Sequence, residues 1–321
     1  MNIDEIIDNI DSNNLDIAFG RVVNISAVTL SAVGLDVAVG DIVRIESAQK
    51  LYTVLGMVTV LKDGLFVIVP FSFIDGFKIN DKVFLQRDGL TIKCGNGLLG
   101  RVVNALGEPI DDLGKIRDLD TNAPINKESM SPLDRGIIDK KFATGVKAID
   151  SMLTCGKGQK VGIFAGSGVG KSTLMGMIVQ GCEATIKVIA LVGERGREIP
   201  EFIHYNLNNN LENTVIVTAT SDESPLMRKY AAFTAMTIAE YFRDKGYDVL
   251  LMIDSVTRFA MAQREIRLST GEPPVSRGYP PSVFALLPQL MERAGNSKKG
   301  SITAFFTVLV DGDDMNDPIA D

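Results

Sequence analysis

The sequence predicts an α/β protein in which a parallel-sheet core follows a small N-terminal β-barrel. Short β-rich segments separated by turns occupy the first 90 residues, and apolar strands alternate with helical stretches from about residue 142. One junction between a strand and a helix carries a glycine-rich loop. Many short, evenly spaced strands are typical of a barrel, whereas the alternation of strands and helices is typical of a covered parallel sheet.

Composition indicates a folded protein of enzyme size and excludes several classes. The chain has 321 residues, 45% of them hydrophobic and 23% charged, which is ordinary for a globular protein of about two domains. A net charge of −7 gives no overall basic field for nucleic acid or anionic lipid. The cysteines, Cys94, Cys155 and Cys182, are odd in number and far apart, which indicates a reducing compartment. A single histidine, His204, excludes a His-rich zinc site, and a surface or packing role is favoured for it.

The N-terminal segment, residues 1–16, is predicted to contain a short amphipathic helix. Ile3, Ile6, Ile7 and Ile10 recur at helical spacing, opposite acidic residues. This stripe could dock on a partner, and packing on the chain's own barrel or fraying is an equal alternative. The segment has no basic region followed by a long apolar stretch, so no secretory signal is expected.

Residues 17–90 are predicted to form the barrel. Its expected strands are Phe19–Ile25, Asp41–Glu46, Tyr52–Val60, Leu65–Val69 and Lys82–Gln86. Asp63-Gly64 and Asp88-Gly89 are hairpin signals. The nearly uncharged stretch Ala27–Val39 is interpreted as a buried barrel strand, with a ligand-covering strand pair as the alternative. No catalytic cluster is visible in this region.

Residues 91–141 are rich in Gly, Pro and Asp and are interpreted as a connecting segment. The core is expected over residues 142–321. Its predicted strands are Lys160–Phe164, Val188–Val192, Val215–Ala219, Val249–Ile253 and Ser301–Val310.

A glycine-rich loop lies between the first core strand and a helical stretch. Residues 165–173 read Ala-Gly-Ser-Gly-Val-Gly-Lys-Ser-Thr, which is a Walker A phosphate loop apart from Ala165 at its first position. The predicted phosphate cradle is Gly166, Ser167, Gly168, Val169, Gly170, Lys171, Ser172 and Thr173. Its glycines permit backbone N–H groups to converge on phosphate oxygens, Lys171 reaches the β- and γ-phosphates, and Ser172 can bind Mg²⁺. The surrounding strand and helix favour this function over a plain glycine-rich turn.

Two carboxylates and an arginine follow other core strands. Asp254 ends the strand Val249–Ile253, the Walker B position, from which a carboxylate reaches the hydrated Mg²⁺. Glu194 lies in the charged stretch Gly193–Glu198 and could orient and deprotonate the attacking water. A solvated loop with an internal Arg–Glu pair is an equal alternative for that stretch. Arg258 could face the γ-phosphate or pair with a surface acid.

These motifs together resemble a known family. The stretches Gly166–Thr173, Gly193–Glu198 and Leu251–Arg258 are similar to those of the catalytic subunits of rotary ATP synthases, which have RecA-like P-loop NTPase cores in hexameric rings. Four further stretches resemble the ATPase of flagellar type III protein export: Ala262–Ile266, Gly271–Pro274, Gly278–Ser282 and Glu292–Gly295. The likeness covers nearly the whole chain, and Pro132–Arg135, Thr144–Asp150 and Asp313–Asp321 add to it.

The resemblance implies an ATPase with ATP as substrate and Mg²⁺ as cofactor. It assigns Lys171 and Ser172 to the phosphates and Mg²⁺, Asp254 to a metal-bound water, and Glu194 to activation of the nucleophilic water. Arg195 and Arg258 would lie near the γ-phosphate.

The resemblance also implies partners and a location. It implies a homo-oligomeric ring, expected to be a hexamer, with a central stalk-like protein, an export gate and export chaperones as partners. In the family the N-terminal segment engages a regulatory dimer, which would give the isoleucine stripe its partner. The implied location is cytoplasmic, peripheral to the inner face of the membrane, and no nucleic acid is expected.

The sequence stops at Asp321, before the arginine-finger strand, the adenine contacts and the helical C-terminal domain of this family. We therefore expect residues 142–321 to be an incomplete core that binds Mg-nucleotide weakly, hydrolyses it slowly and is mostly monomeric. An arginine finger contributes about 10³- to 10⁵-fold in turnover.

Four other functions stay open at this point. A virulence injectisome ATPase has the same motifs, and a rotary synthase subunit fits the Gly278–Ser282 and Glu292–Gly295 stretches poorly. An RNA-translocating ring shares the core, but residues 17–90 contain few Lys or Arg. A non-hydrolysing nucleotide-binding scaffold would not need Glu194.

Overall fold

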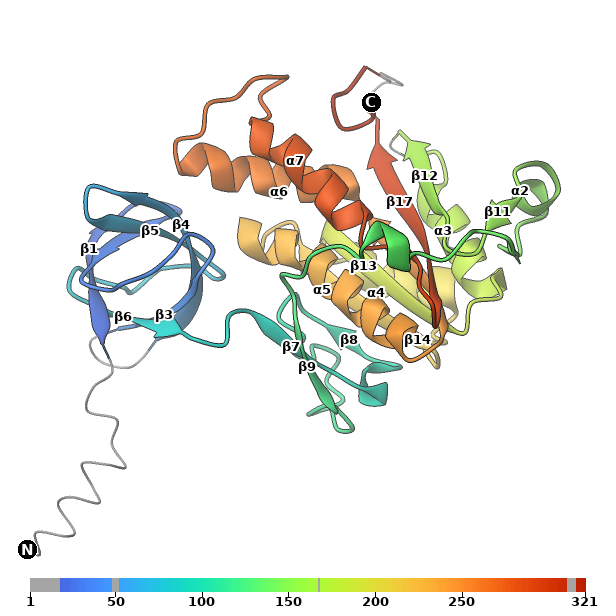
Figure 1. Ribbon diagram of the computed structural model, residues 1–321, viewed down its shortest axis with the longest axis horizontal. Coiled ribbons are helices and arrows are strands. Elements are labelled where there is room, and N and C mark those ends of the chain that lie inside the picture. The colour runs from blue at the N-terminus through green and yellow to red at the C-terminus, as the bar shows by residue number, and fades with distance from the viewer. Residues whose placement is uncertain (1–17, 48–51, 167, 311–315) are drawn as a thin grey trace, which may run out of the picture. The chain divides into compact units, whose positions relative to one another are not determined.

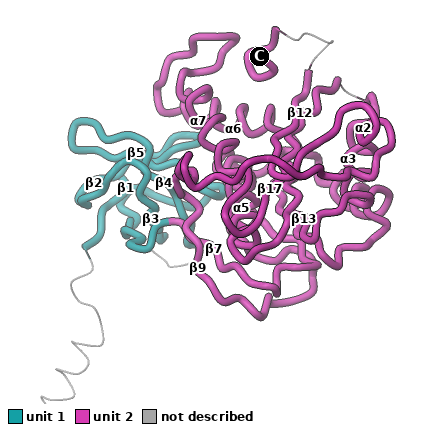
Figure 2. The backbone as a smooth tube through the Cα atoms, turned by 45° about the vertical axis from the view of Figure 1, so that its right-hand side comes forward, with its two compact units in different colours: residues 1–89 teal, residues 90–321 magenta. Residues whose placement is uncertain are grey.

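The structure, a computed structural model, describes residues 18–47, 52–166, 168–310 and 316–321. The chain divides into two compact units, residues 1–89 and 90–321, which Figure 2 shows in separate colours. The amphipathic helix expected within residues 1–16 lies outside the described residues. Within the described ranges, no helix has both the length and the apolar character needed to cross a membrane.

Unit 1 contains the predicted barrel, closed by antiparallel strands in the order β1-β2-β5-β4-β3-β6. The strands are β1 (Phe19–Ile25), β2 (Leu30–Val33), β3 (Ile42–Glu46), β4 (Thr53–Lys62), β5 (Leu65–Pro70) and β6 (Lys82–Gln86). Alternate side chains point inward and form an apolar core that includes Val22, Leu30, Ile45, Phe66 and Ile68. The stretch Ala27–Val39 supplies one strand, β2, as the buried-strand interpretation predicted.

One of the two hairpin predictions is confirmed and the other is wrong. Asp63 and Gly64 both have positive φ, 53° and 75°, and join β4 to β5 as a primed turn does. At Asp88-Gly89 the chain does turn, with the Gly89 N–H donating to the Gln86 carbonyl at 3.2 Å. The next strand, β7 (Thr91–Cys94), pairs with β9 (Thr121–Pro124) instead of β6. A local turn makes a hairpin only when the strands on either side of it pair, and here the partner is distant in sequence.

Residues 91–141, the expected connecting segment, contribute structure to unit 2. The β7–β9 ribbon is antiparallel, and β8 (Val102–Val103) pairs in parallel with β14 (Thr214–Thr220) at the edge of the main sheet. Single 3₁₀ turns occur at Asn96–Leu98 and Pro132–Asp134. These strands are too short for a periodic pattern to reveal them in a stretch rich in glycine and proline.

The main sheet of unit 2 has the order β12-β17-β15-β13-β14-β8, and these neighbours are all parallel. Its long strands are β12 (Lys160–Ala165), β13 (Ile186–Glu194), β14 (Thr214–Thr220), β15 (Asp248–Asp254) and β17 (Ser301–Leu309). They confirm the five strands predicted for the core. Short pieces add to them: β16 (Gly295–Asn296) lies antiparallel to β17, and β10 (Lys141–Phe142) pairs with β11 (Cys155–Gly156).

Helices cover this sheet, as Figure 1 shows. They are α2 (Lys147–Met152), α3 (Lys171–Gly181), α4 (Glu198–Glu201), the π-helical turn η3 (Phe202–Asn206), α5 (Pro225–Asp244), α6 (Val256–Ser269) and α7 (Pro281–Met291). Helix α5 packs against β13, β14 and β15 and is buried along most of its length. Met175, Ile178 and Val179 of α3 pack into an apolar cluster with residues of β13, β15 and β17. The strands are apolar throughout because helices cover them.

The strand order determines where ligands can bind. In the order β12-β17-β15-β13 the strands are parallel, so their carboxyl ends lie along one edge of the sheet. Open α/β sheets bind ligands outside these ends. The phosphate loop, Asp254 and Glu194 all lie at this edge.

Candidate active site

The phosphate loop joins β12 to α3 through two glycines with left-handed backbone. Gly168 has φ +78° and Gly170 has φ +98°, a region that side chains with a Cβ rarely adopt. Gly170 is the N-cap of α3, which begins at Lys171. The unpaired N–H groups of the first turn of α3 and the adjoining loop form an anion-binding end. Ser167 of the predicted cradle lies outside the described residues, and Val169 is exposed.

Lys171 lies between the two predicted carboxylates. Its Nζ is 2.5 Å from Oδ1 of Asp254 and 3.7 Å from Oε1 of Glu194. The three side chains are largely buried: the exposed fraction is 12% for Lys171, 5% for Asp254 and 17% for Glu194. One ammonium is therefore the counter-ion of two carboxylates in a poorly solvated environment. The structure brings together residues that the sequence separates by up to 83 positions.

The environment of Glu194 raises its pKa to about 7. Burial is the largest cause because it disfavours the charged carboxylate, and the negative charge of Asp254 acts in the same direction. Lys171 opposes both effects. A carboxylate with a pKa near neutrality can take a proton from a substrate water at physiological pH.

Asp254 has a second donor that the sequence analysis did not identify. The Thr307 hydroxyl, on β17, donates to Oδ1 of Asp254 at 2.6 Å, and Thr307 is fully buried. A hydroxyl within the otherwise apolar stretch 304–310 is the sequence signal that could have found it. The peptide bond between Asp254 and Ser255 is cis.

The two predicted arginines lie beside the same cavity in different ways. Arg195 has a side chain 70% exposed and lies 3.8 Å from Glu198, so the charged stretch contains the internal pair that sequence analysis kept as an alternative. Arg258, on α6, has a buried Nε with no hydrogen-bond partner in the described part of the chain. A Cβ added to Gly193 would lie only 3.0 Å from the Cβ of Arg258, so the aliphatic part of Arg258 packs closely against this glycine.

Lys171, Glu194 and the two arginines line a cavity of about 750 Å³. Nine of the site residues predicted from the sequence line this cavity: Gly166, Gly168, Gly170, Lys171, Ser172, Thr173, Glu194, Arg195 and Arg258. Sequence analysis did not single out Glu198, Ser221, Leu309 and Val310, which also line it. The Ser221 N–H donates to the Glu194 carbonyl at 3.0 Å, which fixes the backbone of the catalytic candidate.

The donor set at this edge fits a magnesium ion that is bound together with a nucleotide. Within the described ranges, no cluster of three or more His, Cys, Asp or Glu side chains could hold a metal alone. Mg²⁺ is usually held by one or two protein oxygens together with substrate phosphates and water. The Ser172 hydroxyl and the Asp254 carboxylate are such oxygens, beside a phosphate loop.

Comparison with known proteins gives a consistent result. The nucleotide-binding domain of the ATP synthase alpha/beta family matches residues 145–321. The flagellum-specific ATP synthase of Helicobacter pylori is 59% identical over 304 residues, which cover 94% of this chain and 70% of that protein.

Two solved structures share the fold. The assembled ATPase EscN from the type III secretion system of enteropathogenic E. coli has a TM-score of 0.87 and 45% identity, covering 94% of this chain and 72% of that one. EscN in complex with its central stalk EscO has a TM-score of 0.84 and 45% identity, covering 91% and 71%. At these identities the likeness extends beyond the fold to the sequence.

Proposed function

The chain belongs to the ATP synthase alpha/beta family, and from this premise we propose that it is an ATPase of flagellar type III protein export. ATP hydrolysis would serve chaperone release and substrate unfolding at the export gate. The flagellar protein of Helicobacter pylori is 59% identical to this chain, whereas the secretion ATPase EscN is 45% identical. The flagellar match at 59% identity favours the flagellar system over an injectisome.

The single observation that supports the hydrolytic activity is the contact of the Lys171 ammonium with the carboxylates of both Asp254 and Glu194. When a nucleotide binds, the ammonium can exchange these carboxylates for the β- and γ-phosphate oxygens, which carry more negative charge. Asp254 and Glu194 then lose their common counter-ion while they lie next to the reacting phosphate. The exchange couples nucleotide binding to the electrostatic state of both carboxylates.

Glu194 would act as the general base. Its pKa of about 7 lets the carboxylate accept a proton from the attacking water without requiring a strongly basic group. The hydrogen bond from the Ser221 N–H holds the Glu194 backbone. Positioning and charge stabilisation are the main demands of phosphoryl transfer, and both are met by a side chain anchored at a strand end.

Ser172 and Asp254 would hold the magnesium ion. A bound Mg²⁺ supplies charge neutralisation at the β- and γ-phosphate oxygens. The backbone N–H groups after Gly168 and Gly170 bind and orient the phosphates. Arg258, with its buried Nε, and Arg195 would stabilise negative charge at the γ-phosphate.

Assembly and partners follow from the same family membership. We propose a homohexameric ring with a central stalk-like protein, in line with EscN, which has been solved as an assembled ATPase and with its stalk EscO. A regulatory dimer at residues 1–16, export chaperones and the export gate complete the proposed partners. The proposed location is cytoplasmic, at the inner face of the membrane.

Nucleotide binding and phosphate release by this chain test the proposal. A fluorescent ATP analogue should bind to the wild-type chain in the presence of Mg²⁺ and lose its affinity in Lys171→Ala. Phosphate release from Mg-ATP, measured over a wide protein concentration range, should stay slow, with Lys171→Ala as the blank. Lys160→Ala is the matched control, because Lys160 pairs with Glu292 at 2.5 Å in the same unit.

Different outcomes test different parts of the proposal. Equal binding by the wild type and Lys171→Ala would contradict the nucleotide site. Fast turnover that climbs with concentration would contradict the expected slow, monomeric behaviour. Stimulation of the full-length protein by RNA would favour the translocase. Restoration of motility by the full-length Lys171→Ala protein, in a host that lacks its export ATPase, would contradict the coupling of hydrolysis to export.

A further inference from the structure

Thr307 occupies the strand that separates the phosphate-loop strand from the Walker B strand. β17 lies between β12 and β15, and the register pairs Thr307 with Ile163 on one side and Phe306 with Ile253 on the other. Thr307 is fully buried and its neighbours in sequence are apolar. A buried hydroxyl is unfavourable unless it is hydrogen-bonded, so its partner identifies what it does.

The partner is the carboxylate of Asp254. The Thr307 Oγ1 is 2.6 Å from Oδ1 of Asp254 and 3.5 Å from the carbonyl of Ile253. A hydroxyl has one proton to donate, and the shorter contact to a charged acceptor takes it. Thr307 therefore donates to Asp254.

Lys171 and Thr307 donate to the same oxygen. Nζ of Lys171 is 2.5 Å from Oδ1, and the only hydrogen bonds to this carboxylate from described residues end on that atom. No hydrogen bond from a described residue ends on Oδ2. When Lys171 moves to a phosphate, Thr307 is the donor that still holds Oδ1.

We propose that Thr307 is a positioning residue that keeps Oδ2 of Asp254 directed at the magnesium side of the site once Lys171 has moved to the nucleotide. The inference rests on the proposed binding of Mg-nucleotide. Thr307 acts through Asp254 and touches neither phosphate nor metal itself. Its contribution therefore depends on the metal and not on the nucleotide alone.

The test compares nucleotide affinity with and without metal in Thr307→Val, which replaces the hydroxyl by a methyl group of similar shape. The affinity for a fluorescent ADP is measured in excess Mg²⁺ and again in EDTA, with thermal unfolding as a second readout. Thr307→Val should weaken binding in Mg²⁺ about tenfold, since a hydrogen bond to a charged group is lost, and change it less than twofold in EDTA. Thr307→Ser, which keeps the hydroxyl, should bind like the wild type.

Thr303→Val is the matched control on the same strand. Thr303 is also buried, and its Oγ1 accepts from the Gly158 N–H at 2.9 Å, away from the phosphate loop. This variant should lose stability without changing the ratio of the two affinities. In an Asp254→Asn background, Thr307→Val should have no further effect on that ratio, because the positioned carboxylate is already gone.

Four results would overturn the inference. Equal weakening in Mg²⁺ and EDTA would make Thr307 purely structural, and so would a loss in Thr307→Ser as large as in Thr307→Val. Unchanged affinities in both Mg²⁺ and EDTA in a folded Thr307→Val would show that Lys171 or the backbone suffices. If the wild type itself binds the nucleotide equally well in Mg²⁺ and in EDTA, the proposed binding of Mg²⁺ is contradicted, and the inference about Thr307 is contradicted with it.

Discussion

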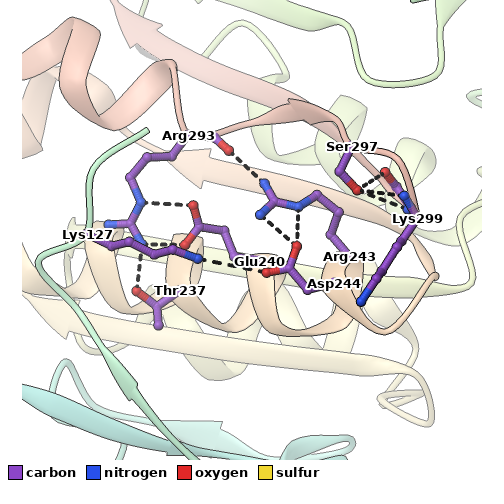
Figure 3. Close-up of polar contacts among 9 residues, drawn as sticks. Lys127, Thr237, Glu240, Arg243, Asp244, Arg293, Ser297 and Lys299 are labelled. Carbon is purple, nitrogen blue, oxygen red and sulfur yellow. Dashed lines mark hydrogen bonds and ion pairs between the residues drawn. The ribbon is translucent and has the colours of Figure 1, made fainter. Parts of the chain in front are cut away.

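Two buried ionic clusters in unit 2, around Arg293 and around Lys171, differ in how their charges are balanced. Around Arg293, one guanidinium meets one carboxylate: Nη2 is 2.7 Å from Oε2 of Glu240 and Nε is 3.1 Å from Oε1. Nη1 donates to the Ile125 carbonyl at 2.8 Å and Nη2 to the Thr237 hydroxyl at 2.9 Å. Figure 3 shows the contacts of Arg293 with Glu240 and Thr237, between α5 and the turn that follows α7. Around Lys171, one ammonium is shared by two carboxylates.

The difference separates a structural cluster from a functional one. Each of the three nitrogens of the Arg293 guanidinium donates to a protein acceptor, so the charge is balanced without a ligand. These contacts join segments that are far apart in sequence. The Lys171 cluster has one more carboxylate than cations, and burial raises the pKa of Glu194 to about 7. Perturbed titration in a cavity is typical of active sites. Burial of charge alone would not distinguish the two.

The largest expected effect comes from breaking the structural cluster. Arg293→Ala leaves Glu240 buried without its partner and should lower the free energy of unfolding by about 3–5 kcal/mol. For a unit of this size the melting temperature should fall by roughly 6–20 °C. The double variant Arg293→Met/Glu240→Leu should regain much of that loss. Thermal unfolding measures both, and a stable single variant would contradict the assignment.

A smaller effect, on affinity rather than stability, is expected at the functional cluster. Lys171→Ala removes the cation that moves to the phosphates and should weaken ATP binding about 10²- to 10³-fold. Its melting temperature should stay near that of the wild type, because Glu194 can take up a proton in place of the lost counter-ion. Isothermal titration calorimetry checks the affinity. A large loss of stability would place Lys171 with Arg293 instead.

The pH dependence should sharpen the contrast further. The raised pKa of Glu194 means that the folded chain keeps a proton between about pH 4.5 and 7 that the unfolded chain releases. This contribution to stability is therefore present below pH 4.5 and is lost as the pH rises through 7. Conversely, kcat/KM of the assembled enzyme should rise about tenfold from pH 6 to 8 as Glu194 ionises. Glu194→Gln should remove both dependences, and an unchanged pH profile in that variant would contradict its role as base.

The smallest effects are expected at two helix caps. Ser224 caps α5 by accepting from the Met227 N–H at 3.2 Å, and Ser255 caps α6 by accepting from the Arg258 N–H at 3.2 Å. Each change to Ala should cost about 1 kcal/mol of stability. Only Ser255→Ala should also weaken nucleotide binding, because α6 begins two residues after Asp254 and carries Arg258. Equal effects on binding would show that α6 does not position the site.

Features set by neighbouring residues could be predicted from the sequence, and pairings between distant ones could not. The Asp63-Gly64 hairpin and the phosphate loop were both predicted, because a turn or a glycine-rich loop depends on the backbone of a few adjacent residues. The Asp88-Gly89 signal failed because it says nothing about which strand β7 joins. β8 was not predicted because a strand of two residues is too short to show an alternation of apolar and polar side chains. Thr307 was overlooked because its partner lies 53 positions away.

The sequence by itself determined the chemical inventory of this protein: a barrel, a parallel-sheet core, a phosphate loop, a lysine and two carboxylates at strand ends. Local backbone geometry and the spacing of apolar residues encode these features. Only the tertiary structure decided that β17 lies between β12 and β15, that Lys171 is shared by Asp254 and Glu194, and that Thr307 holds the same oxygen. The order of parallel strands depends on helix crossovers and long-range packing, which no local pattern records.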